Sequence, residues 1–124
     1  MKALIHVDQT RNLQLALNNS KNLLAQAEET GVVIELELVF NGPAIVNLVA
    51  GENAGGENAD NENAEFEAEI KSLIKRGVKV VGCQNSLSSN GISAKDLIEG
   101  VETVPAAIFE LIEKQHQGYA YVKP

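Results

Sequence analysis

The sequence has one cysteine, Cys83, no tryptophan, and only 4% aromatic residues among its 124 positions. A single cysteine cannot form a disulfide within the chain, which excludes a disulfide-stabilised scaffold. No apolar run approaches the roughly 20 residues that a membrane-spanning helix needs, and no secretory signal pattern precedes the first predicted strand. We therefore expect a cytoplasmic protein without a membrane partner, whose aliphatic core needs no cross-links.

Basic residues are also scarce, since 10 Lys and Arg stand against 17 Asp and Glu and the formal net charge is -7. A surface of this charge repels a phosphate backbone, so nucleic acid is not an expected partner. Five of the acids fall within 51–65, where no Lys or Arg occurs. The repetitive stretch 51–63, GENAGGENADNEN, cannot build a core and is predicted to be a low-complexity acidic surface insert.

Several common sites are missing from the sequence. One cysteine and two distant histidines, His6 and His116, do not have the spacing of a metal site. No G-x-G-x-x-G follows the first predicted strand, and no glycine-rich loop ends in Lys-Ser or Lys-Thr. Neither a metal nor a cofactor is expected. His116 falls in the last turn of the final predicted helix, where an imidazole suits the helix dipole without any further function.

The hydrophobic pattern predicts a regular alternation of strands and helices. Apolar runs predict five strands at 2–7, 32–40, 78–82, 101–104 and 119–122. Periodic stripes and caps predict helices at 10–29, 44–49, 65–76, 94–98 and 106–117, with a capping box at 93–96. This order indicates a single domain, 1–124, of the α/β class. It predicts a three-layer fold in which helices flank a mainly parallel five-stranded sheet.

The second strand is predicted to lie at an edge of the sheet. Glu35 and Glu37 alternate with apolar residues there, as on a strand with one solvated face. A strand order beginning 2-1-3 follows, and it places a ligand crevice at the carboxyl ends of strands 1 and 3. In the last helix, Ile108, Leu111 and Ile112 are expected to face inward.

Cys83 is the residue most suited to chemistry. It follows a buried strand and opens a polar, helix-compatible turn, where free N–H groups favour a thiolate. The alternative is a buried structural cysteine, because free cysteine is among the most buried residue types. The same strand ends contribute five candidate binding residues: His6, Asn41, Gln84, Asn85 and Ser86.

The stretch 78–91, VKVVGCQNSLSSNG, resembles the DsrE/DsrF-like (YchN-like) family. In that family a strand delivers a cysteine, and a small residue and a glycine follow at fixed spacing. Cys83, Ser86 and Gly91 match this pattern. The opening strand and helix, FNGPAIVNL after the second strand, and the C-terminal segment from 100 are also similar, so that the resemblance covers nearly everything except the insert.

The resemblance implies a five-stranded α/β fold, a homo-oligomer such as a trimer or hexamer, and a role in sulfur metabolism. Cys83 would then take up sulfur as a persulfide, and the protein would be a sulfurtransferase or sulfur carrier with donor and acceptor proteins. Two alternatives remain open. One is a non-catalytic oligomeric protein that binds a small molecule or anion in the Cys83 crevice, and the other is a structural subunit of a larger complex.

Overall fold

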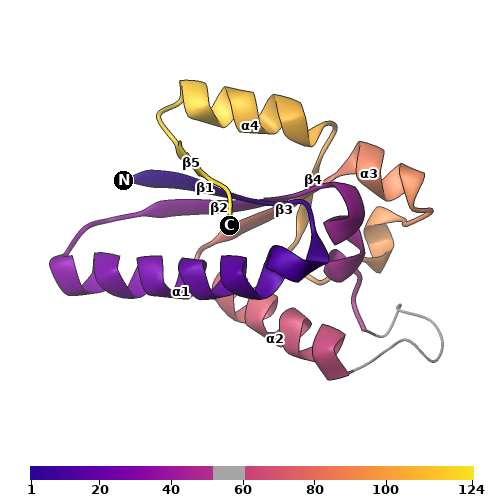
Figure 1. Ribbon diagram of the computed structural model, residues 1–124, viewed down its shortest axis with the longest axis horizontal. Helices are drawn as coiled ribbons and strands as arrows, with labels where there is room; N and C mark the ends of the chain where they lie inside the picture. The colour runs from indigo at the N-terminus through magenta and orange to yellow at the C-terminus, as the bar shows by residue number, and fades with distance from the viewer. Residues whose placement is uncertain (52–60) are drawn as a thin grey trace.

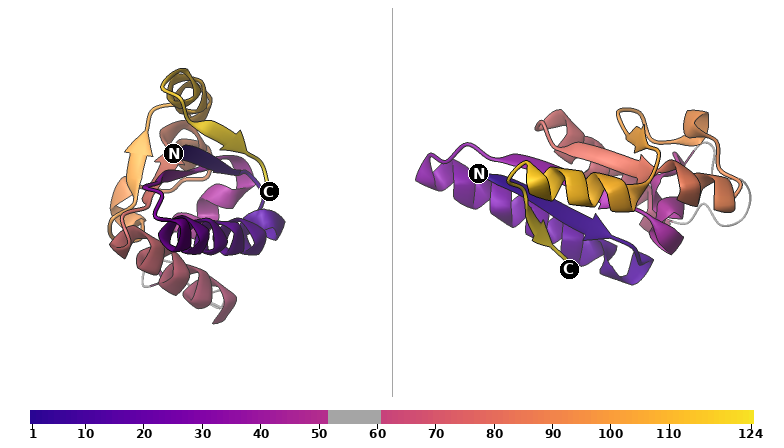
Figure 2. Two further views of the ribbon diagram at one scale, coloured as in Figure 1. Left: turned by 90° about the vertical axis from the view of Figure 1, so that its left-hand side faces the viewer. Right: turned by 90° about the horizontal axis from the view of Figure 1, so that it is seen from above.

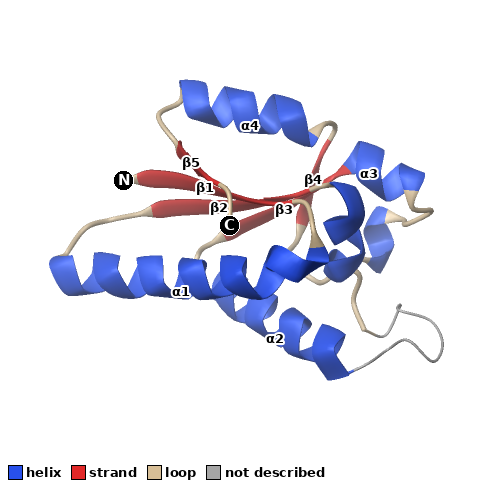
Figure 3. Cartoon of the chain, in the orientation of Figure 1, coloured by secondary structure: helices blue, strands red, loops and turns tan. Residues whose placement is uncertain are grey.

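The computed structural model describes residues 1–51 and 61–124, and it has the predicted alternation of strands and helices (Figures 1 and 3). Its elements are β1 (Lys2–Val7), η1 (Thr10–Asn12), α1 (Leu13–Thr30), β2 (Glu35–Phe40), η2 (Gly42–Leu48), α2 (Asn61–Lys75), β3 (Lys79–Cys83), α3 (Gln84–Ser89), η4 (Ala94–Asp96), β4 (Glu102–Val104), α4 (Ala107–His116) and β5 (Ala120–Val122). Most of the predicted insert, 52–60, lies outside the described residues, and 61–63 form the start of α2.

The five strands form one sheet in the order β4-β3-β2-β1-β5, with every pair parallel. The predicted α/β class and parallel five-stranded sheet are confirmed. The predicted order beginning 2-1-3 is wrong, because β2 lies between β1 and β3 and hydrogen-bonds to both. The crevice expected between strands 1 and 3 is therefore replaced by a strand.

The prediction that the second strand lies at the edge of the sheet is wrong because Glu37 is buried. Only 1% of this residue is exposed, although Glu35, at the start of the same strand, is open to solvent. The Glu37 carboxylate lies 3.5 Å from the ammonium of Lys79 on the neighbouring strand β3. The charged residue that alternates with apolar ones in β2 is therefore buried and contacts a lysine, whereas on an edge strand it would face solvent.

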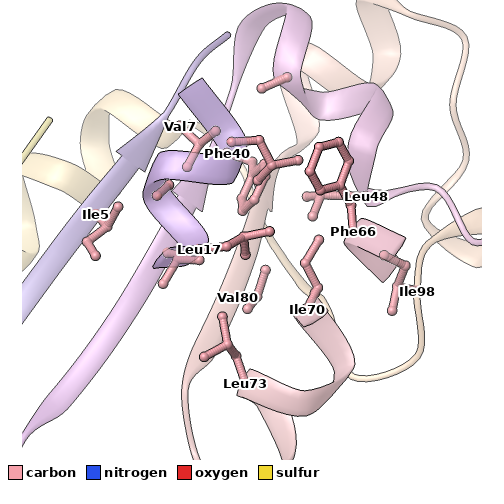
Figure 4. Packing of buried hydrophobic residues seen from close by; sticks show 14 of the residues in the cluster. Ile5, Val7, Leu17, Phe40, Leu48, Phe66, Ile70, Leu73, Val80 and Ile98 are labelled. Atoms are coloured by element: carbon pink, nitrogen blue, oxygen red, sulfur yellow. The ribbon is translucent and has the colours of Figure 1, made fainter. Parts of the chain in front are cut away.

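Helices cover both faces of the sheet. The helices α1 and α2 lie on one face and α4 lies on the other, as the left view of Figure 2 shows. The larger core fills the space between the sheet and the first pair. Figure 4 labels ten of its side chains: Ile5, Val7, Leu17, Phe40, Leu48, Phe66, Ile70, Leu73, Val80 and Ile98. No helix within the described ranges is both long and apolar enough to cross a membrane.

The smaller core lies beneath α4 and holds the cysteine. Its buried members are Leu4, Val39, Val81, Cys83, Ala107 and Leu111. The helix α4 is oriented differently from the prediction, since Ile108 is 66% exposed and Ile112 is 50% exposed, while Leu111 is buried as expected. The inward positions of α4 are instead Ala107, Glu110 and Leu111. Glu110 thus takes an inner position where an isoleucine was expected, and it lies beside Glu37 of β2.

Gly82 allows η2 to pack closely against the end of β3. A Cβ atom at this position would lie 2.9 Å from Cδ1 of Leu48 and 3.2 Å from Cδ1 of Ile45. Leu48 and Ile45 both belong to η2 and are fully buried. Only a residue without a side chain lets η2 approach β3 this closely, and this approach sets the path of the chain into Cys83.

Candidate functional site

Cys83 is the last residue of β3 and the residue that precedes α3. Its backbone is still extended, and it pairs with Val104 of β4. The side chain points to the α4 face of the sheet, where it packs with Val81 and Ala107 and is only 5% exposed. The predicted position at the carboxyl end of a buried strand is therefore what the structure has.

Hydrogen-bond donors from two helices surround the sulfur. The backbone N–H of Ala107, at the start of α4, donates to Sγ at 3.3 Å. Burial raises the pKa of the Cys83 thiol, but the N–H of Ala107, the N–H and hydroxyl of Ser86 and the N–H of Asn85 together outweigh it. The pKa of Cys83 is therefore lowered from that of an ordinary thiol. No Lys or Arg occurs between 84 and 92, so peptide dipoles and a hydroxyl, more than a nearby cation, favour the thiolate.

Ser86 connects this environment to the end of β2. Its hydroxyl oxygen accepts a hydrogen bond from the N–H of Gly42 at 3.0 Å. The hydroxyl proton is then free to point toward the sulfur of Cys83. Gln84 is directed elsewhere, because its amide donates to the hydroxyl of Thr103 on β4 at 3.0 Å. Gln84 and Asn85 are both exposed, so they border the buried thiol from the solvent side.

His6 and Asn41 contact each other. The Nε2 atom of His6 lies 2.8 Å from Oδ1 of Asn41, and Nδ1 lies 2.6 Å from the hydroxyl of Tyr121. Because an amide oxygen only accepts, Nε2 carries the ring hydrogen and Tyr121 donates to Nδ1. Both ring nitrogens of His6 are thus engaged, one by a residue of β5 and the other by the residue that follows β2.

The structure does not bring His6 next to Cys83. In the strand register His6 pairs with Val39, which in turn pairs with Val81. Since β2 separates the two strands, His6 and the cysteine strand are roughly 10 Å apart, twice the spacing of neighbouring strands. Asn41 is nearer, because it follows Phe40, whose partner on β3 is Gly82.

A pair of buried glutamates lies farther down the same face. Burial raises the pKa of Glu37 to about 7, with further contributions from a hydrogen bond to Glu110 and from its negative charge. The charges of Lys79 and Lys114 act in the opposite direction without reversing the effect. While both groups are ionised, neither carboxylate oxygen of Glu37 nor Oε2 of Glu110 has a hydrogen-bond donor among the described residues, because a carboxylate can only accept.

Three contributors could not be recognised from the sequence. Ala107 acts through its backbone, which leaves no side-chain signal. Tyr121 is one tyrosine in an apolar C-terminal strand, and it meets His6 only because β5 pairs with β1. Glu110 falls on a helix where the isoleucines on either side favoured a different inner face.

Neither the possible metal ligands nor the surface depressions of the described residues identify a ligand for the Cys83 site. Over the residues that the structure describes, no group of three or more His, Cys, Asp or Glu could hold a metal ion. A depression of about 400 Å³ lies at the start of α4, lined by Val104, Pro105, Ala106, Phe109, Glu110 and Glu113. A larger one, about 790 Å³, lies between α2 and the turn at Glu99 and Gly100.

The fold and the site define a small three-layer α/β protein with one parallel sheet and a covered thiol at a strand end. The sequence matches the DsrE/DsrF-like family over residues 1–124, and the chain belongs to that family. A comparison with curated protein sequences finds no significant match.

Solved structures with the same fold include proteins from three organisms. The protein of unknown function MTH1491 from Methanobacterium thermoautotrophicum is 24% identical, with a TM-score of 0.82 over 99% of this chain and 98% of that one. The ychN protein from E. coli is 19% identical, with a TM-score of 0.67 over the whole of both chains. BT1422 from Bacteroides thetaiotaomicron, of unknown function, is 12% identical, with a TM-score of 0.70 over 99% of this chain and 94% of that one. At these identities the likeness establishes the fold.

Proposed function

We propose that this DsrE/DsrF-like protein carries sulfur as a persulfide on Cys83 and passes it between a donor and an acceptor protein. The observation that carries the proposal is the set of donors around the sulfur, from Ala107, Ser86 and Asn85, which lower the pKa of the thiol although it is buried. A thiolate is the nucleophilic form of cysteine. Membership of the family supports the choice of sulfur chemistry.

The transfer step needs no cofactor and no net oxidation. The Cys83 thiolate attacks the outer sulfur of a donor persulfide, R–S–SH, and forms a new S–S bond. The donor S–S bond breaks, the R–S⁻ group leaves with the electron pair and takes up a proton from solvent, and Cys83 becomes Cys83–S–SH. The N–H of Ala107 and the hydroxyl of Ser86 would stabilise the charge on sulfur before and after the attack.

The second candidate is a non-catalytic binding protein, and the burial of Cys83 favours it. Cys83 is only 5% exposed and the start of α4 covers its side chain, so that a donor gains access only when this helix moves. A thiol that stays sealed among aliphatic side chains is unreactive. The two candidates therefore differ in whether native Cys83 reacts at all.

Mass spectrometry after treatment with a small-molecule persulfide donor separates them. Sulfur carriage predicts one adduct per chain of about 32 Da, the mass of one sulfur atom, which dithiothreitol removes and Cys83→Ser abolishes. Ser88→Ala, an exposed change on the same short helix, serves as a control that should load normally. If the native chain stays unmodified while the urea-unfolded chain reacts, Cys83 is core packing and the binding function is the better one.

We further propose that the protein is a homo-oligomer, a trimer or a hexamer, and that the outer face of α4 takes part in its contacts. Phe109 is 67% exposed and lies beside Ile108 and Ile112, and an apolar face of this kind is typical of a protein interface. Light scattering should give a mass well above the 13.3 kDa of one chain. Phe109→Glu should lower it, whereas Val33→Glu, at an exposed site on another segment, should leave it unchanged. A monomer mass for the unaltered protein at micromolar concentration would refute the assembly.

A further inference from the structure

The helix α4 is the cover of Cys83. It crosses the face of the sheet opposite to α1 and α2 (Figure 1), and its first N–H group is bonded to the sulfur. The apolar contacts beneath it form the smaller of the two cores, to which α4 itself contributes Ala107 and Leu111. Movement of this helix away from the sheet would expose the thiol and remove one of the donors that surround it.

One turn along, the same helix places Glu110 over Glu37 of β2. Glu110 is 8% exposed and Glu37 is 1% exposed, so that neither carboxyl group is hydrated as a surface carboxylate is. Two ionised carboxylates can only accept hydrogen bonds, and their unpartnered oxygens here reflect this. A proton on one of them converts the pair into a donor and an acceptor, and the repulsion into a hydrogen bond.

The charged groups around Glu37 come from two elements, α4 and β3. On α4 they are Glu110 and Lys114, and on β3 the ammonium of Lys79 lies 3.5 Å from Oε1. Glu102 of β4 acts on Lys79 and not directly on Glu37. The neighbour on β1 is the uncharged Leu4.

Cys83 lies on the same face of the sheet, two residues beyond Val81 on β3. The side chain of Lys79 is 41% exposed, so solvent screens its attraction to Glu37. A single ammonium group can neutralise one of the two carboxylate charges and not both.

We infer that Glu37 and Glu110 are positioning residues for Cys83: a proton held between them fastens α4 over the thiol, and loss of this proton to solvent releases the helix and opens the site. The inference rests on the proposed function in one respect only: Cys83, which the movement of α4 would expose, is the residue proposed to carry sulfur. The burial of the pair supports it, as does the pKa of Glu37 near neutrality, which puts the release within the range where thiols ionise. Each pH unit above 7 lowers the protonated fraction of Glu37 about tenfold.

Alkylation of native Cys83 by iodoacetamide tests the inference, because the thiolate displaces iodide whether or not the protein carries sulfur. In a site that stays equally open, the rate rises at most about tenfold per pH unit through thiol ionisation alone. Glu37→Gln keeps the shape and supplies a permanent N–H donor to Glu110. The ratio of the wild-type rate to that of Glu37→Gln should therefore grow from about one at pH 6 to about tenfold at pH 8.

A matched control distinguishes the loss of a negative charge near α4 from the loss of the charge at Glu37 itself. Glu113→Gln removes the same charge from the exposed side of α4 and should follow the wild-type profile. A constant ratio between wild type and Glu37→Gln would overturn the inference, and so would an equal change in Glu113→Gln. Should Glu37→Gln not fold, Glu110→Gln supplies the same permanent N–H donor from the other side of the pair and should likewise keep the alkylation rate at pH 8 below that of the wild type.

Hydrogen exchange separates this inference from sulfur carriage. In a Cys83→Ser background, the amides of α4 should lose protection between pH 6 and 8 faster than base-catalysed exchange explains, and adding Glu37→Gln should restore it. If this holds while persulfide loading fails, the proton-dependent cover stands and the proposed function falls. If loading succeeds and α4 stays equally protected with either residue at 37, only the inference about the glutamate pair falls.

Discussion

Replacing Glu37 by glutamine should remove much of the loss of stability that the protein suffers as the pH rises to 8. The carboxyl is buried on a central strand, and its pKa is raised from 4.5 to about 7 in the folded chain. A group whose pKa is raised by folding binds its proton more tightly in the native state than in the unfolded one. Its stabilising contribution is complete below about pH 4.5 and is lost as the pH rises through 7.

The size of the effect follows from the two pKa values. A rise from 4.5 to about 7 corresponds to on the order of 3 kcal/mol between the two ends of the pH range. Glutamine has no proton to lose, so the unfolding free energy of Glu37→Gln should stay nearly level where that of the wild type falls. At pH 8 the variant should be the more stable protein, although it has lost a partner of Lys79.

Urea unfolding followed by circular dichroism at pH 5, 6, 7 and 8 measures this difference directly. The protein concentration should be kept constant, since any assembly makes stability depend on it. Glu35→Gln is the matched control, because it removes the same charge from an exposed position on the same strand and should run parallel to the wild type. Parallel curves for wild type and Glu37→Gln would show that the Glu37 carboxyl is solvated in solution, and the argument from its burial would fail.

Three further changes have definite expected outcomes. Gly82→Ala should lower the unfolding free energy by about 1–3 kcal/mol, because the added methyl overlaps buried side chains of η2; an unchanged urea midpoint would mean that η2 shifts freely. Ser86→Ala should raise the pKa of the thiol, as ultraviolet titration of the thiolate would show, whereas Ser88→Ala should leave it unaltered. Lys123→Met should raise the pKa of Asp8, which a hydrogen bond from this ammonium at 2.9 Å holds below its usual range. Carboxyl NMR would show this rise, and an unmoved Asp8 titration would mean that the pair is not formed in solution.

The order and type of the secondary structure elements could be predicted from the sequence alone, because the signals are local. The stripes of α1, the apolar runs of β1 and β3 and the capping box of η4, with Ser93 and Asp96, each depend on residues close together in the chain. The parallel sheet followed from the alternation of these elements. The place of Cys83 at the end of a buried strand followed in the same way, from the run that precedes it and the polar turn after it.

Contacts between distant segments were decided by the tertiary structure. His6 meets Tyr121 across 115 positions of sequence, and the N–H of Ala107 reaches Cys83 across 24. Glu37 looked like the wet face of an edge strand because local pattern records only that a charge alternates with apolar residues. Whether such a charge faces water or a second carboxyl group depends on which strand pairs on each side and on which helix packs above. In this protein α4 and β3 enclose Glu37 with Glu110 and Lys79, and burial together with Glu110 raises the pKa of Glu37 toward neutrality against the opposing charge of Lys79.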